Sequence, residues 1–280
     1  MKEYLNNNVI QYQQQGEIEY IQFNRLLEYP ELTHCYTLRS EGKLNFPPIY
    51  KDEIALKQSY ERISEVLHLD ITKIVKPHQT HTNHVEKIDQ TLMNELNEKR
   101  INSAEKLDQV DGMITNQKEI TLLTTSADCT SLLFFDPIKK VIGSVHSGWK
   151  GTLYAIAKNT VEKMIKEYNC NPKEIICGIC PTIRQCCFEV DEEVKDLFEK
   201  EYSNLEKINQ IILKGNIVEE KQKYYIDTVE INKQLLENAG LKPENILDSG
   251  ICTKCHSDDF HSYRVDKEFS GRNAAVICQF

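Results

Sequence analysis

Three short apolar segments follow one another in the middle of the chain, and they constrain its fold more than any other feature. Residues 120–125, 131–135 and 141–146 each have the length and composition of one buried strand. Residues 152–168 follow with apolar side chains at helical spacing, which predicts a long amphipathic helix. The centre of the chain therefore predicts a sheet that is covered by at least one helix.

Weaker patterns elsewhere predict further elements of both kinds. We expect strands over 9–12, 18–23, 174–179, 246–252 and 274–278, and helices over 55–69, 191–202 and 229–239. Because strands and helices do not alternate strictly, an α/β fold of the α+β kind with a mixed sheet fits better than a doubly wound one. No Ser-, Gly- or Pro-rich linker divides the chain, so we predict a single domain over residues 1–280.

The charge and the N-terminal sequence exclude several classes of partner. Acidic residues outnumber basic ones by 43 to 34, for a net charge of −9. This balance argues against a nucleic-acid polymer, because phosphate backbones are bound by clustered Lys and Arg. No apolar run approaches the roughly 20 residues that span a bilayer, and the first residues lack the basic start and apolar core of a signal peptide. We therefore expect a soluble, cytoplasmic protein that does not contact a membrane.

Ten cysteines in such a chain favour reduced thiols over disulfides, and one of them has two suitable histidine partners. Cys129 follows the first central strand, His146 ends the third, and His81 lies in a polar segment before them. Residues at strand ends commonly face clefts. Two imidazoles and one thiolate are a ligand set for catalytic zinc, because the fourth position stays open for water or substrate. Since copper accepts the same ligands, Zn²⁺ is predicted with Cu²⁺ as the alternative.

The same residues leave a second chemistry open. A thiolate activated by an imidazole is a nucleophile, so Cys129 and His146 are also compatible with a metal-free hydrolase. His78, His81 and His84 recur every third residue, but in an extended segment at most two of them share a face. We assign only His81 to the metal.

The other cysteine motifs are interpreted as carrying no chemistry. Residues 252–256 spell C-x-x-C-H, a haem-attachment pattern, but haem attachment requires export. We assign no zinc site to this motif, because we interpret no other cysteine pair as completing a four-cysteine site. Cys186 and Cys187 would point to opposite sides of an extended chain, which argues against a ligand pair.

Four residues are the predicted substrate-binding groups. Arg39 and Arg264 can hold a phosphate by a bidentate contact, and Lys150 lies near the expected start of a helix. Asp128, directly before Cys129, is interpreted as a partner that orients a histidine or as a strand-end cap.

Taken together, the motifs resemble one family, the YfiH/LACC1 family. The resemblance covers residues 34–280 and rests on segments in the family's order: Gln79-Thr80-His81-Thr82, Asp111-Gly112-Met113-Ile114-Thr115, Ala127-Asp128-Cys129, Asp136-Pro137, residues 145–151 (VHSGWKG), residues 186–190 (CCFEV), Ser262-Tyr263-Arg264 and Gly271-Arg272. It implies a CNF1/YfiH-like mixed β-sandwich flanked by helices, with His81, Cys129 and His146 as the metal ligands.

The resemblance also implies a function. Members are described as zinc-binding purine nucleoside phosphorylases, which implies cleavage of adenosine, inosine or methylthioadenosine with phosphate, and adenosine deamination as a further activity. The family was earlier described as copper-dependent polyphenol oxidases (laccases) and as peptidoglycan editing factors. The alternatives are therefore a copper oxidase and a metal-free Cys–His amidase of cell-wall precursor editing. A multicopper oxidase needs H-x-H pairs, which this chain lacks.

The sequence departs from the family pattern around the predicted substrate contacts. Lys150 stands where the family has an arginine, and Val265 replaces the second arginine of an S-Y-R-R segment. Lysine keeps the charge but loses the bidentate fork. The metal ligands are intact, so substrate preference is the property these departures affect.

Overall fold

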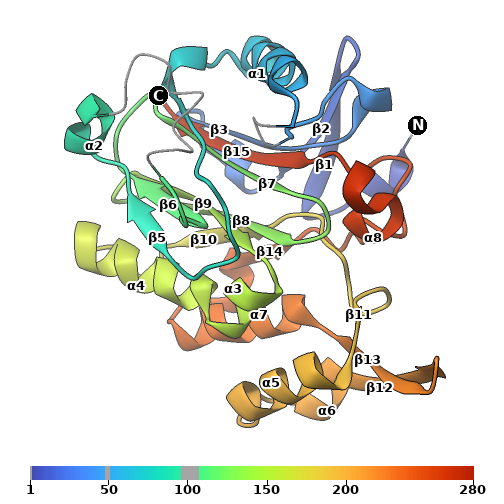
Figure 1. Cartoon of the computed structure of the whole chain (residues 1–280). Coiled ribbons are helices and arrows are strands. Elements are labelled where there is room, and N and C mark those ends of the chain that lie inside the picture. Colours follow the sequence, from blue (N-terminus) through green and yellow to red (C-terminus); the bar gives the residue numbers. More distant parts are fainter. Residues whose placement is uncertain (1, 48–50, 96–106) are drawn as a thin grey trace.

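Two facing six-stranded sheets form the centre of the protein (Figure 1). The computed structural model describes residues 2–47, 51–95 and 107–280. The first sheet has the order β1 (Ile10–Gln15), β2 (Ile18–Phe23), β3 (Leu32–Thr37), β15 (Asn273–Gln279), β7 (Thr121–Ser126), β4 (Ile74–Val75). The second has the order β14 (Ile246–Asp248), β10 (Ile176–Ile179), β8 (Thr130–Asp136), β9 (Val141–Ser147), β6 (Gly112–Thr115), β5 (Val85–Lys87).

Helices cover the outer faces of this sandwich. The helices are α1 (Glu53–Leu67), α2 (Gln90–Glu95), α3 (Trp149–Leu153), α4 (Ile156–Tyr168), α5 (Glu192–Tyr202), α6 (Ile208–Ile211), α7 (Thr228–Asn238) and α8 (Tyr263–Asp266). Helix α1 packs on the first sheet, and α4 and α7 pack on the second (Figure 1). A small third sheet, in the order β11 (Glu189–Val190), β13 (Lys221–Ile226), β12 (Ile212–Val218), lies beside α5 and α6.

The continuous apolar runs of the central strands follow from burial on both faces. In β8, Leu133 and Phe135 point into the core between the sheets, whereas Leu132 and Phe134 pack under α4 and α7. A strand with two buried faces loses the apolar–polar alternation of a half-exposed strand. This confirms the predicted mixed α/β fold and the three central strands.

The prediction of one continuous helix over residues 152–168 is wrong, because the structure has two helices, α3 and α4, in this region. Ala155 adopts a left-handed conformation (φ 58°) between α3 and α4. The hydroxyl of Tyr202 donates to the carbonyls of Thr152 and Leu153, at 2.6 and 3.0 Å. These carbonyls belong to the end of α3, so a distant side chain satisfies the acceptors that a continuous helix would have paired. The strand predicted over 246–252 is also shorter, since the chain turns at Gly250 (φ 74°) after β14.

Two crossings between the sheets define one end of the sandwich. The chain passes from β7 in the first sheet to β8 in the second through residues 127–129, and from β4 to β5 through residues 76–84. Strand β9 ends beside the first crossing, because Thr130 pairs with Ser147. Cys129, His81 and His146 are thereby brought to the same end of the sandwich.

Among residues 2–47, 51–95 and 107–280, no helix has both the length and the apolar character needed to cross a membrane.

Candidate metal centre and active site

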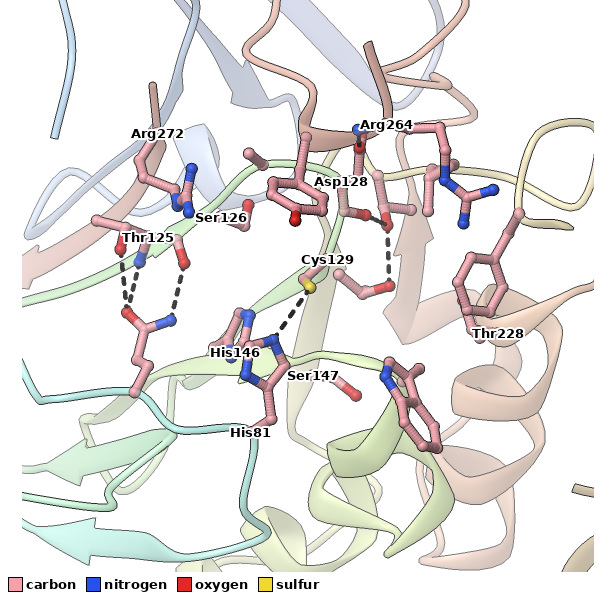
Figure 2. A pocket seen from close by; sticks show the side chains of 18 of the residues that line it. His81, Thr125, Ser126, Asp128, Cys129, His146, Ser147, Thr228, Arg264 and Arg272 are labelled. Atoms are coloured by element: carbon pink, nitrogen blue, oxygen red, sulfur yellow. Dashed lines mark hydrogen bonds between the residues drawn. The ribbon is translucent and has the colours of Figure 1, made fainter. Parts of the chain in front are cut away.

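Cys129, His81 and His146 converge on one point, as the sequence predicted. The ligand atoms of the three side chains all lie within 4.8 Å of one another. The Sγ atom of Cys129 is 3.8 Å from Nε2 of His81, and the two imidazole rings meet edge to face with their centroids 5.0 Å apart. Figure 2 shows both rings beneath the Cys129 sulfur. His146 is buried, Cys129 is half-buried and His81 is exposed. The triad therefore lies at the boundary between the core and the solvent.

Asp111 holds both histidines in place. Its buried carboxylate accepts a hydrogen bond from Nδ1 of His146 at 2.8 Å. It also accepts from the backbone N–H groups of Thr80, His81 and Thr82, at 3.2, 3.1 and 2.7 Å. The bond to Nδ1 leaves Nε2 of His146 to face the triad, and the backbone bonds fix the loop that carries His81 in its left-handed conformation (φ 65°). A carboxylate behind a histidine is the usual support of a metal-ligating imidazole.

The charges at this site favour ionised forms. Burial disfavours the charged forms of all three groups, but the hydrogen bond from His146 and those from Thr82 lower the pKa of Asp111 to about 2. The positive charge of His146 and hydrogen bonds from both imidazoles lower the pKa of the Cys129 thiol to about 6. The Cys129 thiolate and Asp111 in turn raise the pKa of His146 to about 9. These contacts favour the thiolate of Cys129, which is the form that binds metals and attacks electrophiles.

A cavity of about 670 Å³ opens above the triad. Its lining combines aromatic side chains, Trp149 and Phe188, with cationic ones, Lys76, Arg264 and Arg272. Figure 2 shows Arg264 and Arg272 approaching it from opposite sides. Cavities of this size hold small organic ligands, with a few polar groups fixing the orientation.

Residues 42–279 match the family described as "Multi-copper polyphenol oxidoreductase laccase". The chain belongs to this family. A Bacillus subtilis member, named purine nucleoside phosphorylase YlmD, is 29% identical over 232 residues, which cover 82% of this chain and 79% of the relative. A member from an unidentified prokaryote, named adenosine deaminase RL5, is 28% identical over 268 residues, which cover 93% of this chain and 98% of that protein.

The fold of the family is the fold observed. The crystal structure of the hypothetical protein YfiH from Bacillus licheniformis superimposes with a TM-score of 0.81 at 25% identity, covering 96% of this chain and 99% of the other. The resemblance to the YfiH/LACC1 family is thus confirmed. With relatives that carry enzyme names over most of the chain, this member is an enzyme.

The structure separates the four predicted substrate-binding residues into two pairs. Arg264 and Asp128 line the cavity. Arg39 and Lys150 do not belong to the cavity lining: Arg39 donates to the carbonyl of Ser257 at 2.8 Å, and the Lys150 ammonium lies over the Trp149 ring, 5.5 Å from its centroid.

Asp128 has a different role from the one its position suggested. Its carboxylate accepts hydrogen bonds from the hydroxyls of Thr253 and Ser262, at 2.6 and 3.0 Å, and from the backbone N–H of Arg264 at 2.7 Å. Among the described contacts of Asp128 there is no histidine, so the interpretation as a histidine-orienting partner is replaced by Asp111. Asp128 instead ties the turn that carries Cys129 to two C-terminal segments.

Besides Asp111, three polar residues of the cavity lining that bear on the proposed function were not assigned from the sequence. Lys76 and Arg272 line the cavity, as does Gln79, whose side-chain amide exchanges two 2.8 Å hydrogen bonds with the backbone of Thr125. Gln79 and Arg272 lie within the segments that resemble the family, so their positions in those motifs could have marked them as site residues. Lys76 follows a strand of only two residues, and its sequence context shows nothing unusual.

Of the three regularly spaced histidines, His78, His81 and His84, we assigned only His81 to the metal, and the positions of the three side chains agree with this. His78 faces Asp108, with Nδ1 2.6 Å from the carboxylate, and His84 lies 3.2 Å from Glu86. Of the three, only His81 belongs to the metal-ligand group found among the described residues.

Proposed function

We propose that this protein is a zinc-dependent purine nucleoside phosphorylase. Its substrates would be adenosine, inosine and methylthioadenosine, and adenosine deamination would be a second activity of the same site. The observation that carries the proposal is the convergence of His81, Cys129 and His146 at the floor of a ligand-sized cavity. The names of the relatives supply the substrate class.

The donor set fits a zinc ion. His81, Cys129 and His146 would hold it, with two nitrogens and one thiolate as its protein ligands. When bound, the ion supplies a Lewis acid beside the reacting atoms. Asp111 keeps the imidazole of His146 in the tautomer whose Nε2 is available to the metal.

The cavity lining offers complementary groups for the two substrates. The aromatic faces of Trp149 and Phe188 suit a purine ring, which stacks on aromatic side chains. Lys76, Arg264 and Arg272, the cationic side chains of the cavity lining, are our candidates for the phosphate. In phosphorolysis a phosphate oxygen attacks C1′ of the ribose, and the bond from C1′ to the base nitrogen breaks. The chain's own contribution is to hold the anion and the base in line for this attack.

The pH dependence of phosphate binding tests the role of Lys76. Burial, and then repulsion from Arg272, lower the pKa of Lys76 to about 8. Lys76 therefore loses its charge as the pH rises through this value. We expect the KM for phosphate to rise about tenfold between pH 7 and pH 9, the loss of one charge-assisted hydrogen bond. Steady-state kinetics measure this effect, and the KM for the nucleoside serves as the internal control. In Lys76→Met the KM for phosphate should be high at both pH values, and a pH step that persists in this variant would refute the assignment.

A substitution at Gly148 tests whether the activity requires the observed position of the His81 ring. A Cβ atom at Gly148 would lie 2.5 Å from Cδ2 of His81, although the backbone there (φ −63°, ψ 173°) accepts any residue. Gly148→Ala should therefore displace the His81 ring without unfolding the chain. We expect activity to fall about 100-fold, the usual effect of a displacement near 1 Å, while the melting temperature stays within a few degrees. Unchanged activity would show that His81 is not needed at this position.

Product analysis distinguishes the proposed reactions. The purified protein is incubated with adenosine, with and without phosphate, and the products are separated by chromatography. Phosphorolysis predicts adenine and ribose 1-phosphate only when phosphate is present. Deamination predicts ammonia in both samples, with inosine accumulating without phosphate and being cleaved further to hypoxanthine when phosphate is present. Absence of all of these products, together with oxidation of phenols by a copper-loaded sample, would favour the copper oxidase.

A second candidate rests on the pairing of Cys129, His146 and Asp111. A thiolate, an imidazole and a supporting carboxylate also form the arrangement of cysteine hydrolases. Such an amidase would keep its activity after strong chelation and lose it when Cys129 is alkylated. The proposed zinc enzyme loses its activity in both treatments.

A further inference from the structure

A second group of cysteines lies outside the active site. The four-cysteine cluster comprises Cys186, Cys187, Cys252 and Cys255, whose Sγ atoms all lie within 4.8 Å of one another. The Sγ atom of Cys255 is 3.8 Å from that of Cys186 and 3.5 Å from that of Cys187. The prediction that the adjacent cysteines could not serve as a ligand pair is therefore wrong.

The local backbone explains why that prediction failed. It assumed an extended chain, but residues 185–187 form a turn in which the N–H groups of Cys187 and Phe188 both donate to the carbonyl of Arg184, at 2.8 and 2.9 Å. In a turn, neighbouring side chains no longer alternate between two faces. Two cysteines that are adjacent in the sequence can then reach the same point.

A short backbone pairing brings the second pair of cysteines to this turn. Thr182 pairs with Cys252 in a parallel bridge. The N–H of Thr182 donates to the carbonyl of Ile251 at 3.2 Å, and the N–H of Thr253 donates to the carbonyl of Thr182 at 3.0 Å. The chain after Cys252 turns, so the C-x-x-C spacing presents Cys252 and Cys255 together. The pair that completes the cluster is therefore Cys186 and Cys187 on a different loop. The other C-x-x-C, Cys177 and Cys180, is buried at β10 and does not belong to the cluster.

We propose that the four-cysteine cluster binds one Zn²⁺ ion as a structural site. Four thiolates are a common ligand set for structural zinc, and a Zn–S distance of about 2.3 Å in a tetrahedron places neighbouring sulfurs about 3.8 Å apart. The two sulfur separations given above agree with this spacing. Two disulfides fit less well, since bonded sulfurs are about 2.05 Å apart and each cysteine would pair with only one other.

The surroundings of the cluster suit a charged site. Cys186 and Cys255 are exposed, Cys187 is half-buried and Cys252 is buried, so a metal ion can enter from solvent. The guanidinium of Arg264 lies next to the cluster, with Nη1 3.5 Å from the carbonyl of Cys187.

The position of the cluster indicates what the ion would do. Phe188 and Glu189, which line the cavity, directly follow the C-C pair. Thr253, between the other two cysteines, donates to Asp128 beside the catalytic Cys129. Four protein ligands leave no open position for substrate, so the ion would clamp two loops of the cavity wall together and take no part in the reaction.

Counting metal ions in the intact chain tests the proposal. Zinc is measured by native mass spectrometry after expression with Zn²⁺, in samples whose folding is verified by circular dichroism. We expect two zinc ions per chain in the wild type, one in Cys255→Ser, one in Cys129→Ala and none in the double variant. Cys170→Ala, which removes a buried cysteine outside both groups, is the control and should keep two. Because each variant empties a different site, failure of this proposal is distinguishable from failure of the proposed function.

Cobalt substitution gives a second readout, because the spectrum of the wild type alone reports how many thiolates bind the ion. Co²⁺ in the wild type should show the intense sulfur-to-metal absorption of four thiolates, and this absorption should persist in Cys129→Ala and be lost in Cys186→Ser or Cys255→Ser. A wild type with one zinc ion per chain, unchanged by Cys255→Ser, would overturn the proposal. So would an intact mass showing that cysteines of the cluster are disulfide-bonded in protein purified without oxidant.

Discussion

Replacing Cys129 by alanine is expected to remove the catalytic zinc ion and to reduce kcat/KM for nucleoside phosphorolysis by at least ~10³-fold, which corresponds to about 4 kcal/mol of transition-state stabilisation. Cys129 is the single thiolate among the three ligand residues of the triad. The half-buried side chain lies at the cavity floor, so its truncation should leave the free energy of unfolding nearly unchanged. Zinc content and steady-state kinetics on one preparation measure both effects.

The control for this variant is Cys170→Ala, because Cys170 is buried away from the cavity lining. It should keep full zinc content and activity. If Cys129→Ala kept both its zinc at the triad and its phosphorolysis, the proposed mechanism would be wrong. If it lost zinc but kept activity, the ion would have a structural role only.

Replacing Asp111 by asparagine should have the second largest effect, although Asp111 touches no substrate in our account. An amide at this position presents N–H donors to backbone N–H groups that need an acceptor, and it no longer matches the charge of His146. We expect the zinc affinity to fall 10- to 100-fold, as for other carboxylates behind a metal ligand. The free energy of unfolding should fall by about 1–3 kcal/mol for each buried group left unsatisfied. Competition with a chelator and urea unfolding measure the two effects.

Asp108→Asn is a matched control, since Asp108 also faces a histidine, His78, but in an exposed pair. It should change neither zinc affinity nor stability, because exposed ion pairs contribute little. Equal zinc affinity in Asp111→Asn and the wild type would show that the carboxylate does not position the ligands.

The convergence of His81, Cys129 and His146 could be predicted from the sequence because Cys129 and His146 lie at the ends of patterned strands. His81 lies in a polar segment and is marked mainly by its family motif. The strand before Cys129 and the strand that contains His146 are buried along their whole length, which gives both a pattern without exposed polar faces. The family motifs single out the same positions. Asp111 lies in a family motif but was assigned no role, since its partners are 29 to 35 residues away in the sequence. They meet it only through the pairing of β6 with β9 and through the loop before β5.

Other features depended on tertiary contacts that no local pattern reports. The break at Ala155 has no glycine or proline to announce it, and the hydroxyl of Tyr202, about fifty residues later, satisfies the freed carbonyls. The four-cysteine cluster was missed for the opposite reason: both of its motifs were noticed, but an extended backbone was assumed at Cys186 and Cys187. A turn at that point changes which side chains can meet.

Anomalous diffraction from crystals of the purified protein, collected on both sides of the zinc edge and of the copper edge, would identify the ion held by the triad. We expect a peak among His81, Cys129 and His146 that appears above the zinc edge and vanishes below it. A peak at the copper edge in that position, or the absence of any anomalous peak there in protein that is active, would contradict the assignment of zinc to the triad.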